Sequence, residues 1–403
     1  MYLKYFWYTP YFHNTYNTDI IVSKTISTLS QINIFPVKSI AGVSQSSAYV
    51  EKQGLQCDRR FMVTDPNGKM ITARTHPQMV KISAIIEPDG LILCYPGLID
   101  LHLTFNELEM KQTEAKVWND SFSAYSTNQE ANQWFSSILS TDAQLLYTGE
   151  QSNRIREKIQ TNVSFADGYP LLVISEASLA ELNKRSTSHH TMSQFRTNLV
   201  ISGDEPFIED SWKRIRIGEV EFEIVKPCQR CILTTVNPRT AQYHPNKEPL
   251  KTFSTFRADE SGNVYFGQNL IAKNEGTIKL GDKIEVLESK EKEFYLDSSS
   301  ETQEKKATPH TSEKSDTPEE VTISLNGHLF TGNTEQPLLM QVEEAGLSIN
   351  NSCRAGLCGA CRVTLESGEV EQEDSPALNQ KLKEAGMILA CCSVPKTDVE
   401  IVD

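Results

Sequence analysis

The chain has 403 residues, of which 38% are hydrophobic and 23% are charged, and its formal net charge is −14. This length allows two or three domains with at least one full hydrophobic core, and the acidic balance argues against non-specific nucleic-acid binding. No apolar run reaches the roughly 18 residues that a membrane helix needs. The aromatic N-terminus lacks a signal-peptide pattern, so we expect a cytoplasmic protein that binds neither nucleic acid nor membrane.

Short strands dominate the first part of the chain. Five β-rich segments lie between turn residues, at residues 31–40, 60–65, 81–87, 91–95 and 101–105. A helix should follow Thr127, because Thr127 and Glu130 have capping-box spacing before a helical apolar pattern.

A second helix is predicted from Ser175, its N-cap, through residues 176–185. Strands then resume at residues 198–203, 215–225, 232–236 and 277–288. The pattern predicts a mostly β, barrel-like fold with helical inserts.

Residues 291–319 have lost almost all apolar side chains and consist mainly of Ser, Thr, Glu, Lys and Pro. Such a segment cannot bury enough surface to offset the entropy of ordering, so we expect a flexible linker. Beyond it, residues 320–403 hold 13 Asp and Glu against 5 Lys and Arg, a net charge of 5 − 13 = −8. This acidic domain would suit a basic protein partner, and a simply solvated surface explains the charge equally well.

Four of the nine cysteines form a metal-ligand pattern near the C-terminus. Cys353, Cys358 and Cys361 are spaced C-x4-C-x2-C in NSCRAGLCGACRV, and Cys391 follows after 29 further residues. The small residues of this loop allow backbone N–H groups to reach the sulfurs. Strands at 321–327 and 397–402, a helix at 337–346 and a hairpin at 361–371 would complete a β-grasp domain.

The cysteine spacing resembles that of plant-type [2Fe–2S] ferredoxins at all four positions. Cys391 is preferred to Cys392 as the fourth ligand, since it keeps the family's distance to a proline, here Pro395. Four cysteines could also hold tetrahedral zinc, although zinc sites more often pair two C-x2-C halves.

A C-x-x-C pair at Cys228 and Cys231, in KPCQRCILTT, has several possible meanings. It could be a redox dithiol, half of a zinc site, or two core cysteines. The β-branched segment after Cys231 predicts a strand, which argues against a thioredoxin-type motif. A fourth reading is that one thiolate binds a redox metal, and the adjoining iron–sulfur domain favours it.

The motifs FPVKSI, DRRFMVTD, ITARTHP, LLVISEASLAELN, FRTNLVISG, KPCQRCILTTVNP and FGQNL…GTIKLGD occur in the order found in MOSC-domain proteins that have an N-terminal MOSC β-barrel. The chain resembles the amidoxime-reducing members of this family and the bacterial MOSC–ferredoxin fusions that reduce N-hydroxylated purine bases. The resemblance covers roughly residues 30–290 and the ferredoxin from about 320, and leaves residues 1–28 unexplained. The expected domains are therefore an N-terminal extension (1–28), a MOSC N-terminal β-barrel (29–150), a MOSC domain (151–290), the linker (291–319) and the ferredoxin domain (320–403).

The resemblance also implies a molybdenum cofactor (Mo-molybdopterin), with Cys231 as the catalytic thiolate that ligates molybdenum. The residues expected to contact the cofactor are Lys38, Ser39, Arg59, Arg196, Asn198 and Arg230. Arg59 is preferred to its neighbour Arg60, Thr197 stands where the family usually has proline, and Cys228 has no assigned role.

The implied activity is a two-electron reduction of the N–O bond in small N-hydroxylated bases, hydroxylamines, amidoximes or N-oxides. The [2Fe–2S] cluster would relay electrons from an external flavoprotein reductase, because no nicotinamide- or flavin-binding module is recognisable in the chain. Three alternatives remain: a MOSC sulfur carrier, an electron-transfer module with an inactive barrel, and an oxidase of another substrate class.

Overall fold

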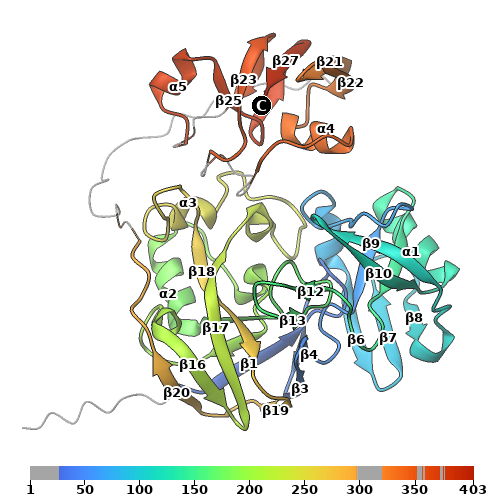
Figure 1. Ribbon diagram of the computed structural model, residues 1–403, viewed down its shortest axis with the longest axis vertical. Coiled ribbons are helices and arrows are strands. Elements are labelled where there is room, and N and C mark those ends of the chain that lie inside the picture. The colour runs from blue at the N-terminus through green and yellow to red at the C-terminus, as the bar shows by residue number, and fades with distance from the viewer. Residues whose placement is uncertain are drawn as a thin grey trace, which may run out of the picture.

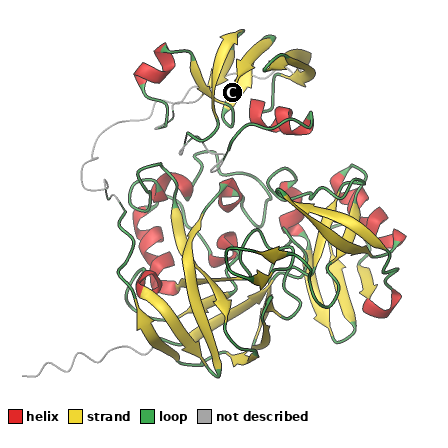
Figure 2. Cartoon of the chain, viewed as in Figure 1, coloured by secondary structure: helices red, strands yellow, loops and turns green. Residues whose placement is uncertain are grey.

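The computed structural model describes residues 27–295, 297, 320–351, 356, 359–372, 375 and 377–403. Strands far outnumber helices in the described fold, and the helices lie outside the sheets (Figures 1 and 2). The mostly β architecture with helical inserts is therefore confirmed. Most of the predicted linker and of the N-terminal extension, together with Cys353 and Cys358, lies outside the described residues.

The largest sheet has eight strands in the order β2-β1-β15-β14-β18-β17-β16-β20. Their bounds, in chain order, are Leu29–Ile34 (β1), Val43–Gln45 (β2), Leu171–Ser175 (β14), Leu199–Ile201 (β15), Trp212–Ile217 (β16), Val220–Gln229 (β17), Tyr265–Ala272 (β18) and Ile284–Ser289 (β20). Neighbours pair antiparallel except β14 and β15, which are parallel. The sheet curls (Figure 1), and one core packs against it, with Trp212 and Phe222 among its largest buried side chains.

A three-stranded sheet shares this core. It consists of Ser47–Glu51 (β3), Gly54–Leu55 (β4) and Gly276–Lys279 (β19), in the order β19-β3-β4. Because β1, β3 and β4 contribute Leu29, Ile32, Val50 and Leu55 to the core, residues 29–55 are built into the part of the structure that holds the large sheet.

The remaining N-terminal strands form a separate lobe beside the large sheet (Figure 1). One sheet has the order β5-β11-β10-β9, with bounds Phe61–Thr64 (β5), Gln112–Val117 (β9), Asp120–Ser126 (β10) and Gln144–Tyr147 (β11). A second comprises Ser83–Glu87 (β6), Gly90–Cys94 (β7) and Leu101–Thr104 (β8), and a two-stranded ladder pairs Ile155–Arg156 (β12) with Thr161–Asn162 (β13).

Helix α1, Gln129–Leu139, covers the N-terminal lobe and packs Phe135 into its core. Thr127 was predicted to cap it, and this prediction is wrong. The cap is Asn128, whose side chain accepts a hydrogen bond from the amide of Ala131, because the Thr127 hydroxyl is engaged with the carbonyl of Leu145. The predicted Ser175 cap is confirmed for helix α2, Glu176–Arg185. A short helix α3, Leu250–Phe253, lies near the carboxyl end of β17.

The C-terminal domain has a five-stranded sheet in the order β22-β21-β27-β23-β25. The bounds of its elements are Glu320–Leu325 (β21), His328–Asn333 (β22), Leu338–Glu344 (α4), Arg362–Ser367 (β23), Val370–Gln372 (β24), Gln380–Glu384 (α5), Met387–Leu389 (β25), Ser393–Pro395 (β26) and Val399–Val402 (β27). The predicted hairpin at 361–371 is wrong, since β23 pairs with β25 and β27 whereas β24 pairs with β26. The peptide between them turns away at Gly368, where a Cβ would collide with the carbonyl of Asp398.

None of the helices in the described part of the chain has the length and apolar character to span a bilayer.

Candidate active site

Cys231 lies just past the end of β17, where it begins a 3-10 turn over Ile232–Thr235. The sequence predicted a strand at residues 232–236, and this prediction is wrong. The Thr234 hydroxyl donates to the Cys231 carbonyl over 3.0 Å, and the Thr235 hydroxyl donates to the Ile232 carbonyl over 2.8 Å. The hydroxyl groups of these threonines therefore find their hydrogen-bond acceptors within the turn. Cys231, at the start of the turn, does not pair with a neighbouring strand.

A guanidinium from the N-terminal lobe contacts the Cys231 sulfur. Arg74 lies in the loop after β5, its side chain is 8% exposed, and its Nε donates to Cys231 Sγ over 3.4 Å. Burial alone would raise the pKa of the Cys231 thiol, but the charge and hydrogen bond of Arg74 outweigh burial and lower this pKa from its ordinary value. The site therefore favours the thiolate, the form of cysteine that binds metals.

Asp167 joins this arginine to the predicted Lys38. Asp167 accepts from Lys38 Nζ over 2.7 Å, from Arg74 Nη2 over 2.9 Å and from the indole of Trp118 over 3.2 Å. Against burial, which would raise it, the charges of Arg74 and Lys38 hold the pKa of the Asp167 carboxyl well below its usual range. Burial lowers the pKa of Lys38 to about 8, against the stabilising charge of Asp167. Ser39 follows, buried and with a positive φ of 75°.

Two further predicted arginines stack on one aromatic ring. The guanidinium carbons of Arg59 and Arg196 lie 4.9 and 4.3 Å from the Phe35 ring centroid. Arg59 Nη1 donates to the Asn198 side chain over 3.2 Å, and Arg59 also pairs with the buried Asp58. Burial and the nearby Arg59 lower the pKa of Arg196 to about 9. The surrounding negative charge is therefore too small to compensate the buried positive charge of Arg196.

Arg60 points elsewhere. It pairs with Glu51 and donates to the carbonyl of Glu150 over 2.9 Å. Of the two arginines in DRRF, Arg59 is the one beside Arg196 and Asn198, whereas Arg60 fastens the β3–β4 region.

Arg230 and Cys228, both within the C-x-x-C motif, are hydrogen-bonded to each other. Arg230 Nη1 donates to Cys228 Sγ over 2.9 Å, and its Nη2 donates to the carbonyl of Phe195. Cys228 is therefore an acceptor for an arginine side chain. Phe195 directly precedes Arg196, so this pair brings the C-x-x-C motif to the FRTN loop. In that loop Thr197 is buried, and its carbonyl accepts from Asn33.

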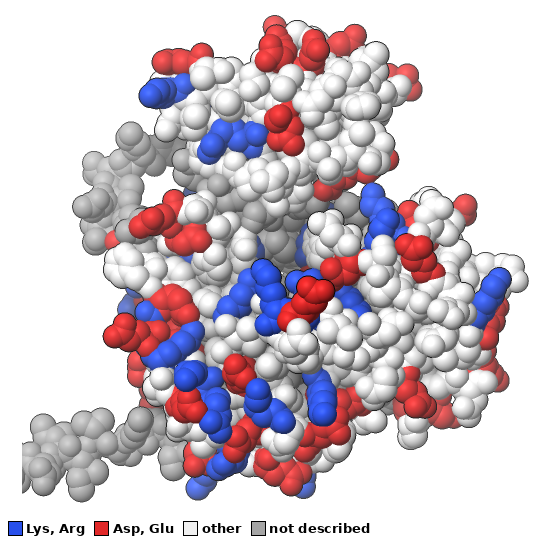
Figure 3. Space-filling model, viewed as in Figure 1, with Lys and Arg blue, Asp and Glu red and all other residues white. Residues whose placement is uncertain are grey.

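Two donors in this region have no acceptor among the described residues. Arg196 Nη2 and Arg230 Nε are buried without a hydrogen-bond partner. Such groups are costly to bury unless something else accepts from them. Together with the surrounding cations they favour an anionic ligand. Figure 3 shows Lys and Arg side chains, with Asp and Glu among them, near the middle of one face.

In the C-terminal domain, Cys361 and Cys391 are both buried. The amide of Gly356 donates to Cys391 Sγ over 3.3 Å, the kind of N–H···S bond expected around a cluster. The thiols of Cys361 and Cys392 lie against Cys391 and raise the pKa of its thiol, so several sulfurs converge on this point. The other two predicted ligands are outside the described residues.

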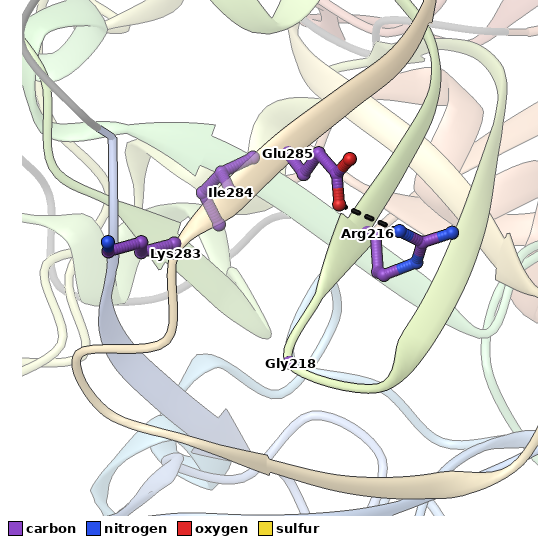
Figure 4. A pocket seen from close by; sticks show the side chains of 5 residues that line it. All are labelled: Arg216, Gly218, Lys283, Ile284 and Glu285. Atoms are coloured by element: carbon purple, nitrogen blue, oxygen red, sulfur yellow. Dashed lines mark hydrogen bonds and ion pairs between the residues drawn. The ribbon is translucent and has the colours of Figure 1, made fainter.

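A cavity of about 400 Å³ lies elsewhere, at the β16–β17 hairpin and β20 (Figure 4). Arg216, in its wall, pairs with Glu285 over 2.7 Å and with Glu221 over 2.6 Å. β17 runs from this hairpin toward Cys231, and its 10 residues span about 30 Å. The cavity is thus remote from the cysteine, and Arg216 in its wall is paired with two carboxylates.

Sequence reasoning missed Arg74, Asp167 and Trp118. Arg74 stands in the ITARTHP motif, which was noted as a family motif but not as a site residue. Asp167 and Trp118 carried no local signal, because each acquires its place through a contact between residues 49 or more positions apart.

The chain matches the family models of the MOSC N-terminal beta barrel domain at residues 26–142, the MOSC domain at 160–285 and the 2Fe-2S iron-sulfur cluster binding domain at 321–396. It is 35% identical to the mitochondrial amidoxime reducing component 2 of Bos taurus over 64% of this chain and 83% of that protein. It is 34% identical to the mitochondrial amidoxime-reducing component 1 of Homo sapiens over 65% of this chain and 83% of that protein. The chain belongs to the amidoxime-reducing component family.

The match to these relatives covers about two thirds of this chain, which also contains the ferredoxin domain at residues 321–396. Among solved structures, the Amycolatopsis cytochrome P450 reductase GcoB aligns with 21% of this chain and 26% of that chain, at 30% identity and a TM-score of 0.20. The domain limits and the cytoplasmic location expected from the sequence remain predictions; the relatives are named as mitochondrial.

This member of the amidoxime-reducing component family is an oxidoreductase with a [2Fe–2S] cluster and a molybdenum cofactor. The residues around Cys231 fit the molybdenum cofactor. A favoured thiolate suits molybdenum, and the unpartnered donors of Arg196 and Arg230 suit the phosphate of a pterin cofactor.

Proposed function

We propose that the protein reduces the N–O bond of small N-hydroxylated compounds, such as amidoximes and hydroxylaminopurine-type bases, at a molybdenum cofactor bound to Cys231. The balanced reaction is R–NHOH + 2 e⁻ + 2 H⁺ → R–NH₂ + H₂O. A separate flavoprotein reductase supplies the electrons one at a time to the cluster held by Cys353, Cys358, Cys361 and Cys391. The names of the relatives support the substrate class.

The observation that carries this proposal is the contact between Arg74 and Cys231. A thiolate held by a buried guanidinium, beside further cations with unpartnered donors, is a site for a metal with an anionic tail. When bound, the molybdenum cofactor supplies a two-electron centre that accepts oxygen from the substrate.

The protein's own residues would bind and orient the cofactor. Arg196, Arg230 and Arg59 offer donors to the anionic part of the cofactor, with Lys38, Ser39 and Asn198 beside them. Lys38 Nζ, with its pKa of about 8, holds a proton at neutral pH at 2.7 Å from Asp167. The reaction consumes two protons, and the buried Lys38 ammonium is one group of this network that carries a proton.

The test compares wild type with Cys231→Ser, Cys228→Ser and Cys391→Ser, all made in a host that synthesises molybdenum cofactor. Wild type should contain about two iron atoms and one molybdenum per chain and should reduce benzamidoxime with dithionite-reduced viologen as donor. Cys231→Ser should keep its iron and lose activity at least roughly 100-fold. Cys228→Ser keeps an acceptor for Arg230 and should stay within a few-fold of wild type.

Cys391→Ser separates the two centres, because it should lose iron while retaining molybdenum. Full activity in Cys231→Ser would overturn the proposal. Iron without molybdenum in the wild-type protein would instead favour the second candidate, a MOSC sulfur carrier or electron-transfer module without N–O reductase activity.

A further inference from the structure

Trp118 is a large aromatic residue in an exposed and strained position. It lies in the two-residue turn between β9 and β10, its φ is 54°, and 42% of its surface is exposed. A bulky residue is rare in the left-handed region, and turns of this kind usually have Asn, Asp or Gly there. An aromatic side chain that persists at such a position points to a role outside the turn.

Its contacts place Trp118 beside the candidate metal ligand. The indole Nε1 donates to Asp167 Oδ1 over 3.2 Å, and the Arg74 guanidinium carbon lies 4.6 Å from the ring centroid. The same guanidinium donates to Cys231 Sγ. One residue therefore separates the ring from the sulfur, and the indole hydrogen bond fixes the direction in which the ring faces.

A second exposed aromatic residue approaches Arg74 from the MOSC domain. Tyr243 is 38% exposed, and its hydroxyl donates to the backbone carbonyl of Arg74 over 2.5 Å. A β-bridge to Val236, five residues after Cys231, anchors the loop that carries it. Two aromatic residues from two domains thus contact one arginine, Trp118 through its ring at the guanidinium and Tyr243 through its hydroxyl at the backbone carbonyl, and each keeps a large accessible area.

We propose that Trp118, with Tyr243, is a specificity-determining residue that selects N-hydroxylated substrates with a flat aromatic ring over aliphatic substrates of the same size. This rests on the proposed function, whose reacting centre is at Cys231. A flat ring gains dispersion and quadrupole energy against Trp that a puckered ring cannot gain. The stacked guanidinium and the Asp167 hydrogen bond hold the Trp ring in place before substrate arrives, which reduces the entropy lost on binding.

A purely structural role for Trp118 predicts something different. If the indole only fastened the N-terminal lobe to Asp167, its loss would disturb Arg74 and slow every substrate alike. The two roles are separated by a pair of substrates that differ in flatness and share size and reacting group, namely benzamidoxime and cyclohexanecarboxamidoxime.

The experiment uses the full-length holoenzyme with reduced viologen as donor and compares wild type, Trp118→Phe and Trp118→Leu. Trp118→Leu should raise KM for benzamidoxime roughly tenfold, with KM for the cyclohexane compound and kcat for both within twofold. The KM of Trp118→Phe for benzamidoxime should lie between those of wild type and Trp118→Leu, because Phe keeps an aromatic ring and loses the N–H donor. Trp134→Phe is the control: Trp134 is on helix α1 of the same lobe, its indole donates to the Ile99 carbonyl, and it should leave both substrates unchanged.

A binding measurement distinguishes failure of this inference from failure of the proposed function. Calorimetry on the oxidised holoenzyme measures Kd for benzamidine and cyclohexanecarboxamidine, which need no turnover. Tighter benzamidine binding that is lost in Trp118→Leu supports the aromatic site, even if wild type reduces neither amidoxime and the proposed reaction is wrong. Equal KM changes for both substrates, or no preference for benzamidine in wild type, would overturn the inference.

Discussion

Arg74 and Cys231 belong to different domains, and the hydrogen bond between them, 3.4 Å from Nε to Sγ, is where these domains meet at the candidate metal site. The loop after β5 presents the guanidinium, and the end of β17 presents the sulfur. The ionisation of the Cys231 thiol thus depends on a residue 157 positions away in the sequence, and this dependence can be measured directly.

We expect Arg74→Met to raise the pKa of Cys231 in cofactor-free protein, because burial then acts without the opposing charge. The thiolate of wild type stabilises the fold above the ordinary thiol pKa, and this contribution is lost as the pH falls through the lowered pKa. The measurement is the rate of iodoacetamide alkylation at Cys231 against pH, read by mass spectrometry. Arg74→Lys retains the charge and should shift the midpoint less. An unchanged midpoint in Arg74→Met would contradict the assignment.

Arg59 and Arg60 are adjacent in sequence and should fail in different ways. Arg59→Gln removes a donor beside Arg196 and should lower molybdenum content at least roughly tenfold. Arg60→Gln breaks its pair with Glu51 and should lower the free energy of unfolding by roughly 3 kcal/mol, with molybdenum content within twofold of wild type.

Elemental analysis and urea denaturation of both variants check this prediction. Each variant serves as the control for the other in molybdenum content only, since Arg59→Gln also breaks the ion pair with the buried Asp58. Loss of molybdenum in Arg60→Gln together with retention in Arg59→Gln would reverse the assignment made here.

Glu209 is a buried carboxyl that costs stability at neutral pH. Its Oε1 accepts from Ser178 Oγ over 2.8 Å, whereas Oε2 has no partner among the described residues. Burial and the neighbouring Asp210 raise its pKa. The folded state therefore holds this proton more tightly than the unfolded state, and stability falls as the pH rises from the ordinary pKa through the raised pKa.

Glu209→Gln should remove that dependence and raise the free energy of unfolding at pH 8 by about 1 kcal/mol or more. Near pH 4 the two proteins should be equally stable, because Glu209 is then protonated in both states. Urea denaturation of wild type and variant across this pH range gives the comparison. A constant difference at all pH values would show that the effect is not the titration of Glu209.

Local patterns predicted the parts of the fold that local interactions determine. Ser175 was recognisable as a helix cap because its hydroxyl accepts from an amide three residues later. Thr127 had the same signature, yet a contact with Leu145, in the next strand of its sheet, took its hydroxyl and left the cap to Asn128. The strand predicted after Cys231 failed for a related reason, since β-branched threonines fit a 3-10 turn when their hydroxyls bond to its carbonyls.

The residues of the candidate site likewise fall into those that sequence motifs indicate and those that only tertiary contacts reveal. Cys231, Lys38 and the predicted arginines stand in recognisable motifs, and the structure brings them into one neighbourhood. Asp167 and Trp118 could not be found, because nothing in the residues around either position indicates a partner in the other domain.

Trp118 and Arg74 come from the N-terminal lobe, whereas Tyr243 and Cys231 come from the MOSC domain, so the proposed substrate-facing residues are drawn from both domains and the proposed metal ligand from one. A chimera that takes residues 61–126 from a relative and keeps the rest of this chain would exchange Trp118 and Arg74 while leaving Tyr243 and the proposed metal ligand Cys231 in place. Under the proposed function, recombination within this lobe would change the substrate range without any change in Cys231.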